Sequence, residues 1–247
     1  MSIYGTEYTR AVYLKKAGYN SKRWVITALL YQLYRENRDK FIHKVFKKKS
    51  AKPLMKYREI EIITEILKNL KPQRTLEWGA GYSTLYFSQF AGKDAKWFSI
   101  EHHGDWAQRV KAMNTNLNME IFYVEPDHFP WTDEFNDGSY SDLKQYIDFA
   151  DGLGDFDFIF IDGRARKEAL RKAFQLIKDD GVVVLHDANR HYYHEPFKLF
   201  NHQALFADKR GDGGGIWVGS KGREINSVLD LALYAKLWRI YNMFQKD

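Results

Sequence analysis

Residues 75–84 read TLEWGAGYST, and this stretch decides the fold. A short strand-like run closes on Glu77, and Gly79 and Gly81 follow it. Ser83 suits the first turn of a helix. The pattern therefore predicts a strand, a tight glycine turn and a helix start, an arrangement in which a ligand can lie against bare backbone.

The ligand expected at this turn carries no phosphate. A dinucleotide-binding turn usually has a third glycine beneath the pyrophosphate, but Thr84 stands at that position. Glu77 would repel a pyrophosphate and can hold an ammonium group. Glu101 lies 22 residues after Gly79 and ends a strand-like run over residues 96–100, where a ribose-binding acid belongs in a doubly wound sheet.

The glycine turn, the acid before it and the acid after it together resemble the class I S-adenosylmethionine-dependent methyltransferases. The resemblance implies that S-adenosyl-L-methionine is the cofactor and that residues around the turn bind it. These residues are Glu77, Gly79, Ala80, Gly81, Ser83, Glu101 and His102. Tyr82 and Trp106 would help to wall the pocket. A nicotinamide-dependent enzyme is the alternative, and Glu77 and Thr84 argue against it.

The composition indicates a folded protein with a large apolar core. The 247 residues are 45% hydrophobic and 16% aromatic, so disorder is not expected. The absence of cysteine excludes disulfides, thiolate metal sites and cysteine nucleophiles, and it fits a cytoplasmic location. The sequence shows neither a signal-peptide core nor an apolar run of the roughly 20 residues that span a bilayer, so any membrane contact would be peripheral.

Positive charge is concentrated in an N-terminal arm. Residues 1–56 carry a net charge of +11, whereas the rest of the chain carries −5. This asymmetry weakens the inference from a basic isoelectric point to nucleic-acid binding. Residues 22–35 have a helical apolar stripe, which residues 41–46 continue among lysines. The helical part of the arm (residues 22–49) either lies on an anionic membrane surface, or its stripe packs on the domain or on a second subunit of a homodimer.

Alternating strand and helix patterns follow the arm. Helical patterns cover residues 56–70, 85–90, 105–113, 167–177 and 225–244, and strand-like runs cover residues 75–77, 96–100, 119–124, 157–161 and 182–185. A hairpin over residues 205–218 would supply an antiparallel last strand. We expect a Rossmann-like, doubly wound α/β sheet of seven mostly parallel strands. Its parts would be a basic helical arm (1–56), a cofactor-binding domain (57–222) and an amphipathic helix (223–247).

Polar side chains end the fourth and fifth strands of the expected sheet. Asp162 follows one strand, and His186 and Asp187 follow the next. Ligands of open α/β sheets bind at the carboxyl ends of the strands. His186 is the expected base for removing the proton of a hydroxyl acceptor. Asp162 or Asp187 would orient it or bind Mg²⁺ or another divalent cation.

The resemblance extends to O-methyltransferases. Catechol-type enzymes bind a metal through an acid after the fourth strand and an Asp-Asn pair after the fifth, and here Ala188 replaces that Asn. The runs IDGRAR (161–166) and HDANR (186–190) are similar to a bacterial group linked to modification of glycans or other small molecules. The resemblance, over residues 57–220, implies methyl transfer to a hydroxyl of a small molecule or glycan. Arg164, Arg166 and Arg190 would grip an anionic acceptor, or they are merely solvated.

Other features leave alternatives open. Residues 125–141 break the periodicity and form either a substrate lid, with His128 and Trp131 touching the acceptor, or an ordinary surface loop. His103, His191 and His194 have no clear role. Base-methylating relatives carry an Asn/Asp-Pro-Pro-aromatic turn after the fourth strand, which this chain lacks. The alternative function is a membrane- or RNA-associated module whose methyltransferase-like body acts on a macromolecule.

Overall fold

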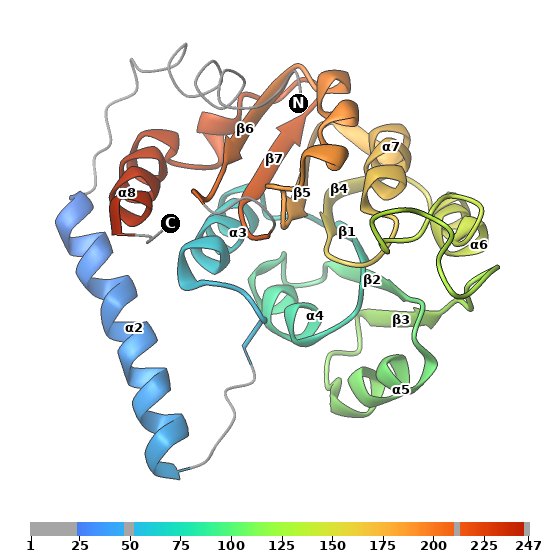
Figure 1. Cartoon of the computed structure of the whole chain (residues 1–247), viewed down its shortest axis with the longest axis horizontal. Coiled ribbons are helices and arrows are strands. Elements are labelled where there is room, and N and C mark those ends of the chain that lie inside the picture. The colour runs from blue at the N-terminus through green and yellow to red at the C-terminus, as the bar shows by residue number, and fades with distance from the viewer. Residues whose placement is uncertain (1–23, 47–51, 210–212, 245–247) are drawn as a thin grey trace.

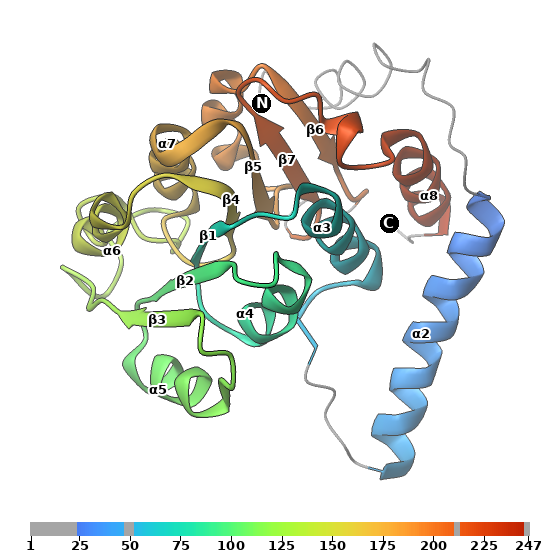
Figure 2. The same ribbon diagram turned by 180° about the vertical axis from the view of Figure 1, so that it is seen from behind.

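The computed structural model describes residues 24–46, 52–209 and 213–244. Seven strands form one sheet in the order β3-β2-β1-β4-β5-β7-β6, with helices on both faces (Figures 1 and 2). Strands β1 to β5 pair in parallel, and β7 is antiparallel to β5 and β6. The predicted doubly wound sheet with an antiparallel last strand is confirmed.

The strands are β1 (Arg74–Trp78), β2 (Lys96–Glu101), β3 (Met119–Tyr123), β4 (Phe156–Ile161), β5 (Ile177–His186), β6 (His202–Phe206) and β7 (Ile216–Ser220). The α-helices are α2 (Val25–Phe46), α3 (Tyr57–Leu70), α4 (Tyr82–Phe87), α5 (Gly104–Met113), α6 (Lys144–Asp148), α7 (Arg166–Leu176) and α8 (Leu231–Phe244).

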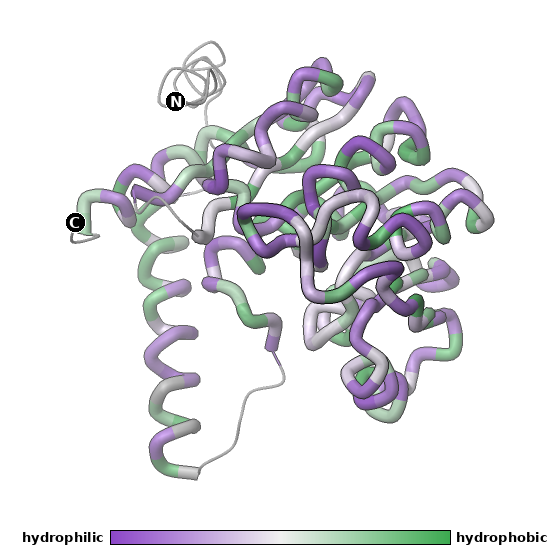
Figure 3. Tube along the Cα trace, turned by 45° about the vertical axis from the view of Figure 1, so that its right-hand side comes forward, coloured by the Kyte–Doolittle hydropathy of each residue, from purple (hydrophilic) through white to green (hydrophobic). Residues whose placement is uncertain are grey.

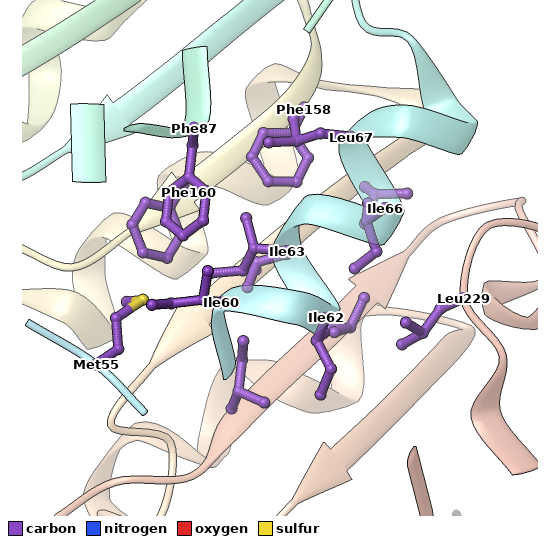
Figure 4. Packing of buried hydrophobic residues seen from close by; sticks show 14 of the residues in the cluster. Met55, Ile60, Ile62, Ile63, Ile66, Leu67, Phe87, Phe158, Phe160 and Leu229 are labelled. Carbon is purple, nitrogen blue, oxygen red and sulfur yellow. The ribbon is translucent and has the colours of Figure 1, made fainter. Parts of the chain in front are cut away.

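The sheet separates two apolar cores. On one face, α3 presents Ile60, Ile63 and Leu67 at helical spacing, and these side chains pack near Phe158 and Phe160 of β4 (Figure 4). Helices α4 and α8 add to the same core. The opposite core lies beneath α6 and α7. Because β4 and the second half of β5 (residues 181–186) are buried on both faces, residues 158–161 and 182–185 read as continuous apolar runs.

Three predicted boundaries were wrong for local reasons. Strand β5 begins at Ile177 and not at the predicted residue 182, because the β4–β5 register jumps from Phe156↔Ile177 to Phe158↔Val182 and leaves a bulge. The last helix begins at Leu231 and not near residue 225, since the Asp230 carboxylate accepts a hydrogen bond from the Leu233 N–H and caps it. Helix α4 ends at Phe87 and continues only as a 3₁₀ turn.

The arm forms one long helix, α2, at the edge of the molecule (Figure 1). It continues past the predicted end at residue 35, whereas residues 1–23 and 47–51 of the predicted arm (1–56) lie outside the described residues. Its inner side packs on the domain, where buried Gln32 contacts Glu61 of α3 and accepts a hydrogen bond from Tyr241 of α8. In the described part of the chain, no helix combines the length and apolarity needed to cross a membrane.

Candidate functional site

The glycine turn after β1 presses against the turn after β4. Gly79 has φ +98°, in the left-handed region that favours glycine. A Cβ placed on it would lie 2.6 Å from the backbone N and Cα of Gly163. Gly81 differs, since its backbone is extended and a Cβ there would lie 3.6 Å from its nearest neighbour. Gly79 is therefore required by the fold as well as by any ligand.

A cavity of about 630 Å³ lies at this edge of the sheet. Its lining comprises Leu54 and residues 79–83, 101–103, 105, 106, 109, 162–164, 166 and 190. The structure thus brings together most of the predicted cofactor residues, together with Asp162 and the three predicted arginines. Glu77, His186 and Asp187 are not part of the lining. Leu54, Asp105 and Arg109 line the cavity although nothing in the sequence pattern singled them out.

The β2 side of the cavity is built around Glu101. Its carboxylate accepts a hydrogen bond of 2.8 Å from the His103 N–H and lies 3.0 Å from Nδ1 of His102. The Trp106 indole donates to the carbonyl of Ala80 at 2.6 Å and meets the Tyr82 ring edge to face. These contacts place an acid and two aromatic rings beside the glycine turn, as the sequence predicted.

Glu77 does not face the cavity, which argues against its predicted contact with an ammonium group. Successive side chains of a strand point to opposite faces, and Glu77 points to the face covered by α3 and α4. Its carboxylate is fully buried and accepts hydrogen bonds from Ser83 (2.7 Å), Trp97 (2.9 Å) and Ser99 (3.2 Å). Burial raises the pKa of Glu77 to about 7, although the hydrogen bonds from Ser83 and Trp97 act to lower it. Through its bond from Ser83, Glu77 therefore holds the first turn of α4 against the sheet.

We expect Glu77→Gln to keep cofactor affinity within about threefold, because the amide can accept from Trp97 and donate to Ser83. The raised pKa of Glu77 means that the folded wild type loses stability as pH rises from about 4.5 to about 7. The free energy of unfolding of the variant should not fall in this way, and the two proteins should differ in this fall on the order of 3 kcal/mol. Urea unfolding across this range and titration with S-adenosylhomocysteine measure both effects. A fiftyfold loss of affinity would mean that the carboxylate contacts the ligand directly.

His186 is held between two acids. Its Nδ1 lies 2.8 Å from Asp162 Oδ1, and its Nε2 lies 3.5 Å from Glu59 Oε2 on α3. Burial alone would lower the pKa of His186, but the charges and hydrogen bonds of Asp162 and Glu59 raise it to about 10. A protonated imidazole with both nitrogens turned to carboxylates does not fit the predicted base. Glu59 has no sequence signal, because it occupies an ordinary first-turn position of a helix.

Arg166 clamps the ends of β4 and β5. Its guanidinium donates to the carbonyls of Gly163 and His186 at 2.9 and 2.8 Å, and lies 3.3 Å from Asp162 Oδ1 and 3.2 Å from Asp187 Oδ2. Burial opposes ionisation of Asp187, yet the charges of His186 and Arg166 lower its pKa to about 2. Arg166 is thus occupied by the protein and is not a free grip for an acceptor.

The two acids predicted to bind a divalent cation do not fit that role. The Arg166 guanidinium lies between Asp162 and Asp187, and His186 takes up the same Asp162 oxygen. The Asp187 Oδ1 atom accepts the Gly214 N–H at 2.9 Å. Within the described ranges, no group of three or more His, Cys, Asp or Glu residues is arranged to hold a metal ion. The carboxylates of Asp162 and Asp187 therefore belong to a network of ion pairs with Arg166 and His186, and this arrangement does not fit a metal site.

Arg164 and Arg190 approach the cavity beside Asp137 of the 125–141 loop. The Asp137 Oδ1 atom is buried and lies 3.9 Å from Arg164 and 4.0 Å from Arg190. In the described part of the chain it has no hydrogen-bond partner. Asp137 accepts the Arg166 N–H through its other oxygen, at 3.2 Å. The loop therefore meets the arginines that line the cavity, although the lid hypothesis itself stays a prediction.

The remaining candidates of this region have structural partners. The Trp131 ring lies 5.8 Å from that of His102, and His128 Nδ1 lies 3.3 Å from Asp142 Oδ1. Buried His194 bonds through Nε2 to the carbonyl of Ala188 at 2.7 Å, and burial lowers its pKa. His191 packs against Tyr192 outside the cavity.

Comparisons with known proteins agree with this geometry. Residues 76–188 match the family model described as a methyltransferase domain. A solved O-methyltransferase from Bacillus cereus in complex with SAH is 14% identical, covers 87% of this chain and 99% of its own, and has a TM-score of 0.51. A methyltransferase-like protein from Silicibacter pomeroyi is 18% identical, with 75% and 98% covered and a TM-score of 0.50. A search among curated proteins found no match.

At these identities the solved structures show the fold alone, whereas the family match covers the glycine turn, Glu101, Asp162 and His186. The match and the sheet order together support a class I S-adenosylmethionine-dependent methyltransferase.

Proposed function

We propose that this enzyme transfers the methyl group of S-adenosylmethionine to a hydroxyl of an anionic small molecule or glycan. The observation that carries the proposal is one cavity that joins the glycine turn and Glu101, on the β2 side, to Asp162 and Arg190 on the β4 and β5 side. The fold shared with an O-methyltransferase in complex with SAH supports both the cofactor and oxygen as the methylated atom.

The cavity has the groups that a sulfonium nucleoside needs. The backbone of residues 79–81 is open to close approach, and Glu101 can accept hydrogen bonds from both ribose hydroxyls. His102, Tyr82 and Trp106 offer ring surfaces beside it. When bound, the cofactor supplies a methyl group on a positively charged sulfur, which an acceptor oxygen displaces in line. The protein mainly holds the partners in register.

Asp162 is the proton acceptor of this proposal. A hydroxyl must lose its proton as its oxygen is methylated, so a base must reach it. Asp162 lines the cavity, whereas His186 lies behind it and carries a positive charge at neutral pH. His186 holds Asp162 Oδ1 in place and is a positioning residue. Arg166 fixes the same carboxylate from the other side at 3.3 Å.

The acceptor class follows from charge on the β4 and β5 side of the cavity. Arg164 and Arg190 lie too far from Asp137 for a hydrogen bond. Arg190 lies 3.5 Å from Asp187 and donates to the Tyr193 hydroxyl at 3.0 Å, and Arg164 donates to the Asn136 carbonyl at 3.4 Å. Because a guanidinium has five N–H donors, each arginine keeps donors for a ligand beyond these contacts. A carboxylate or phosphate on the acceptor can form short, charge-assisted hydrogen bonds with them. A uronic acid or another hydroxylated carboxylate fits this description. The alternative of a macromolecular acceptor has no supporting contact among the described residues and stays a sequence-based hypothesis.

Calorimetric titration tests the cofactor assignment. We expect the full chain to bind S-adenosylhomocysteine and not NAD. Glu101→Gln should weaken binding roughly tenfold or more, because its amide can accept only one of the two ribose hydrogen bonds. Glu120→Gln is the matched control, since Glu120 is exposed on β3 and does not line the cavity. Equal affinities for wild type and Glu101→Gln would contradict the assignment.

A panel of hydroxylated acceptors tests the substrate class. Release of S-adenosylhomocysteine is measured with sugar acids and with their neutral counterparts. We expect turnover with the acids, and a rise in KM of about tenfold or more for Arg190→Gln. Arg223→Gln is the control, since Arg223 pairs with Asp180 away from the cavity. Turnover that favours the neutral sugars would sink the anionic acceptor while leaving the methyltransferase assignment intact.

A further inference from the structure

Helix α2 has two apolar faces, and only one of them is used by the domain. The inner face packs Val25, Ala28 and Leu29 against the core. Gln32 on that face is fully buried beside Glu61 and Tyr241. The helix is therefore fixed to the body, with its opposite side turned away from it.

The opposite side, here named the outer face, consists of Ile26, Leu30, Leu33, Tyr34, Phe41 and Val45. These positions recur at helical spacing along all of α2, so they form one stripe. Ile26 is 67% exposed, and Leu30 and Phe41 are each 61% exposed. Hydrophobic (green) and hydrophilic (purple) residues alternate along the whole helix at the edge of the molecule (Figure 3). A run of large exposed side chains of this kind marks an interaction surface.

The charges of α2 are sorted between the same two sides. Its two acids, Glu36 and Asp39, are partly buried, and Asp39 accepts a hydrogen bond from the Tyr57 hydroxyl of α3 and lies 3.9 Å from Lys52. Lys44 is exposed and lies about one helical turn after Phe41, beside the apolar stripe. The outer face thus combines apolar side chains with positive charge and carries no exposed carboxylate among the described residues.

This pattern distinguishes between two possible partners of the outer face, a second copy of α2 and an anionic lipid surface. A symmetric pairing of two α2 helices would set Lys44 against the apolar stripe or against a second Lys44, with no exposed acid on the face to compensate. An anionic lipid surface accepts both components at once, because apolar side chains enter the acyl boundary and lysines meet the headgroups. The sequence adds three lysines directly after the helix, at positions 47–49.

We propose that the outer face of α2 binds anionic membrane surfaces, so that this methyltransferase works as a peripheral membrane protein. The last turn of α8 also carries exposed Met243 and Phe244, and the bond from Tyr241 to Gln32 holds α8 against the inner face of α2. The proposal is independent of the acceptor and of the groups in the cavity. Its failure would leave the proposed function untouched.

Vesicle co-sedimentation of the full chain tests the proposal. Vesicles of phosphatidylcholine alone are compared with vesicles that also contain phosphatidylglycerol, at low and high salt. We expect binding only to the anionic vesicles and weaker binding at high salt. Leu30→Glu and Phe41→Glu should each lower binding on the order of tenfold or more, through loss of apolar burial and added repulsion. Lys44→Glu should lower it by about tenfold.

The controls separate membrane binding from other occupants of the face. Leu117→Glu changes a side chain that is 99% exposed next to β3, away from α2, and should leave vesicle binding unchanged. Because the outer face is exposed, its variants should melt at the wild-type temperature and bind S-adenosylhomocysteine normally. Wild-type protein that ignores anionic vesicles would overturn the proposal. So would a dimer that Leu30→Glu dissociates, or vesicle binding that appears only after deletion of residues 1–23.

Discussion

Gly79→Ala should abolish measurable binding of S-adenosylhomocysteine and destabilise the fold by roughly 2–5 kcal/mol. The added methyl group would lie 2.6 Å from Gly163 in a backbone conformation with φ +98°, so neither turn can accept it in place. Separating the turns displaces the backbone that faces the cavity, and a loss of about 2.7 kcal/mol already lowers affinity a hundredfold. Urea unfolding and calorimetric titration measure the two effects.

Gly81→Ala is the matched control two residues away. Its Cβ would make only ordinary contacts, the nearest at 3.6 Å from the Ser83 hydroxyl, and its extended backbone suits alanine. We expect its free energy of unfolding to stay within about 0.5 kcal/mol of the wild type. If Gly79→Ala proved as stable as Gly81→Ala, the close contact between the two turns would be wrong. The site built on that contact would then need revision.

The sequence was enough to predict the sheet because the relevant signals are local. Periodicity marked α3, short strand-like runs marked β1 and β2, and an apolar run marked β4, which is buried on both faces. The glycine turn and Glu101 could be placed by spacing alone. The predicted start of β5 at residue 182 was too late, because Asp180 and Gly181 are turn-type residues that here lie at a bulge inside the strand.

The roles of individual acids could not be predicted in the same way. Glu77 was expected at the ligand because it precedes the glycines, but strand alternation points it away from the cavity and toward Ser83. His186 was expected to be a free base, yet Glu59 reaches it from a helix far earlier in the chain. Such pairs are tertiary contacts, and a single sequence carries no signal for them. The same holds for Asp137, which meets Arg164 and Arg190 only in the folded protein.

His186→Ala should destabilise the protein by about 3–5 kcal/mol at neutral pH, because it leaves the buried carboxylate of Glu59 without its cation. The pKa of His186 is raised from 6.5 to about 10, so its contribution is fully present below pH 6.5 and is lost as pH rises toward 10. The wild type should lose stability across that window, and the variant should lack this component. Urea unfolding at a series of pH values measures it.

His128→Ala is the control for this prediction, because His128 is exposed on the 125–141 loop and should change the free energy of unfolding by less than about 0.5 kcal/mol. An NMR titration separates the two roles of His186 directly. As a positioning residue, its imidazole stays protonated through neutral pH, and Asp162 remains the group that meets the acceptor. An imidazole that instead titrates near pH 6.5, with turnover rising over the same range, would restore the free-base mechanism. In that case Asp162→Asn would lower turnover mainly because the His186 ring loses its carboxylate partner. Protonated His186 would then not be the group that positions Asp162.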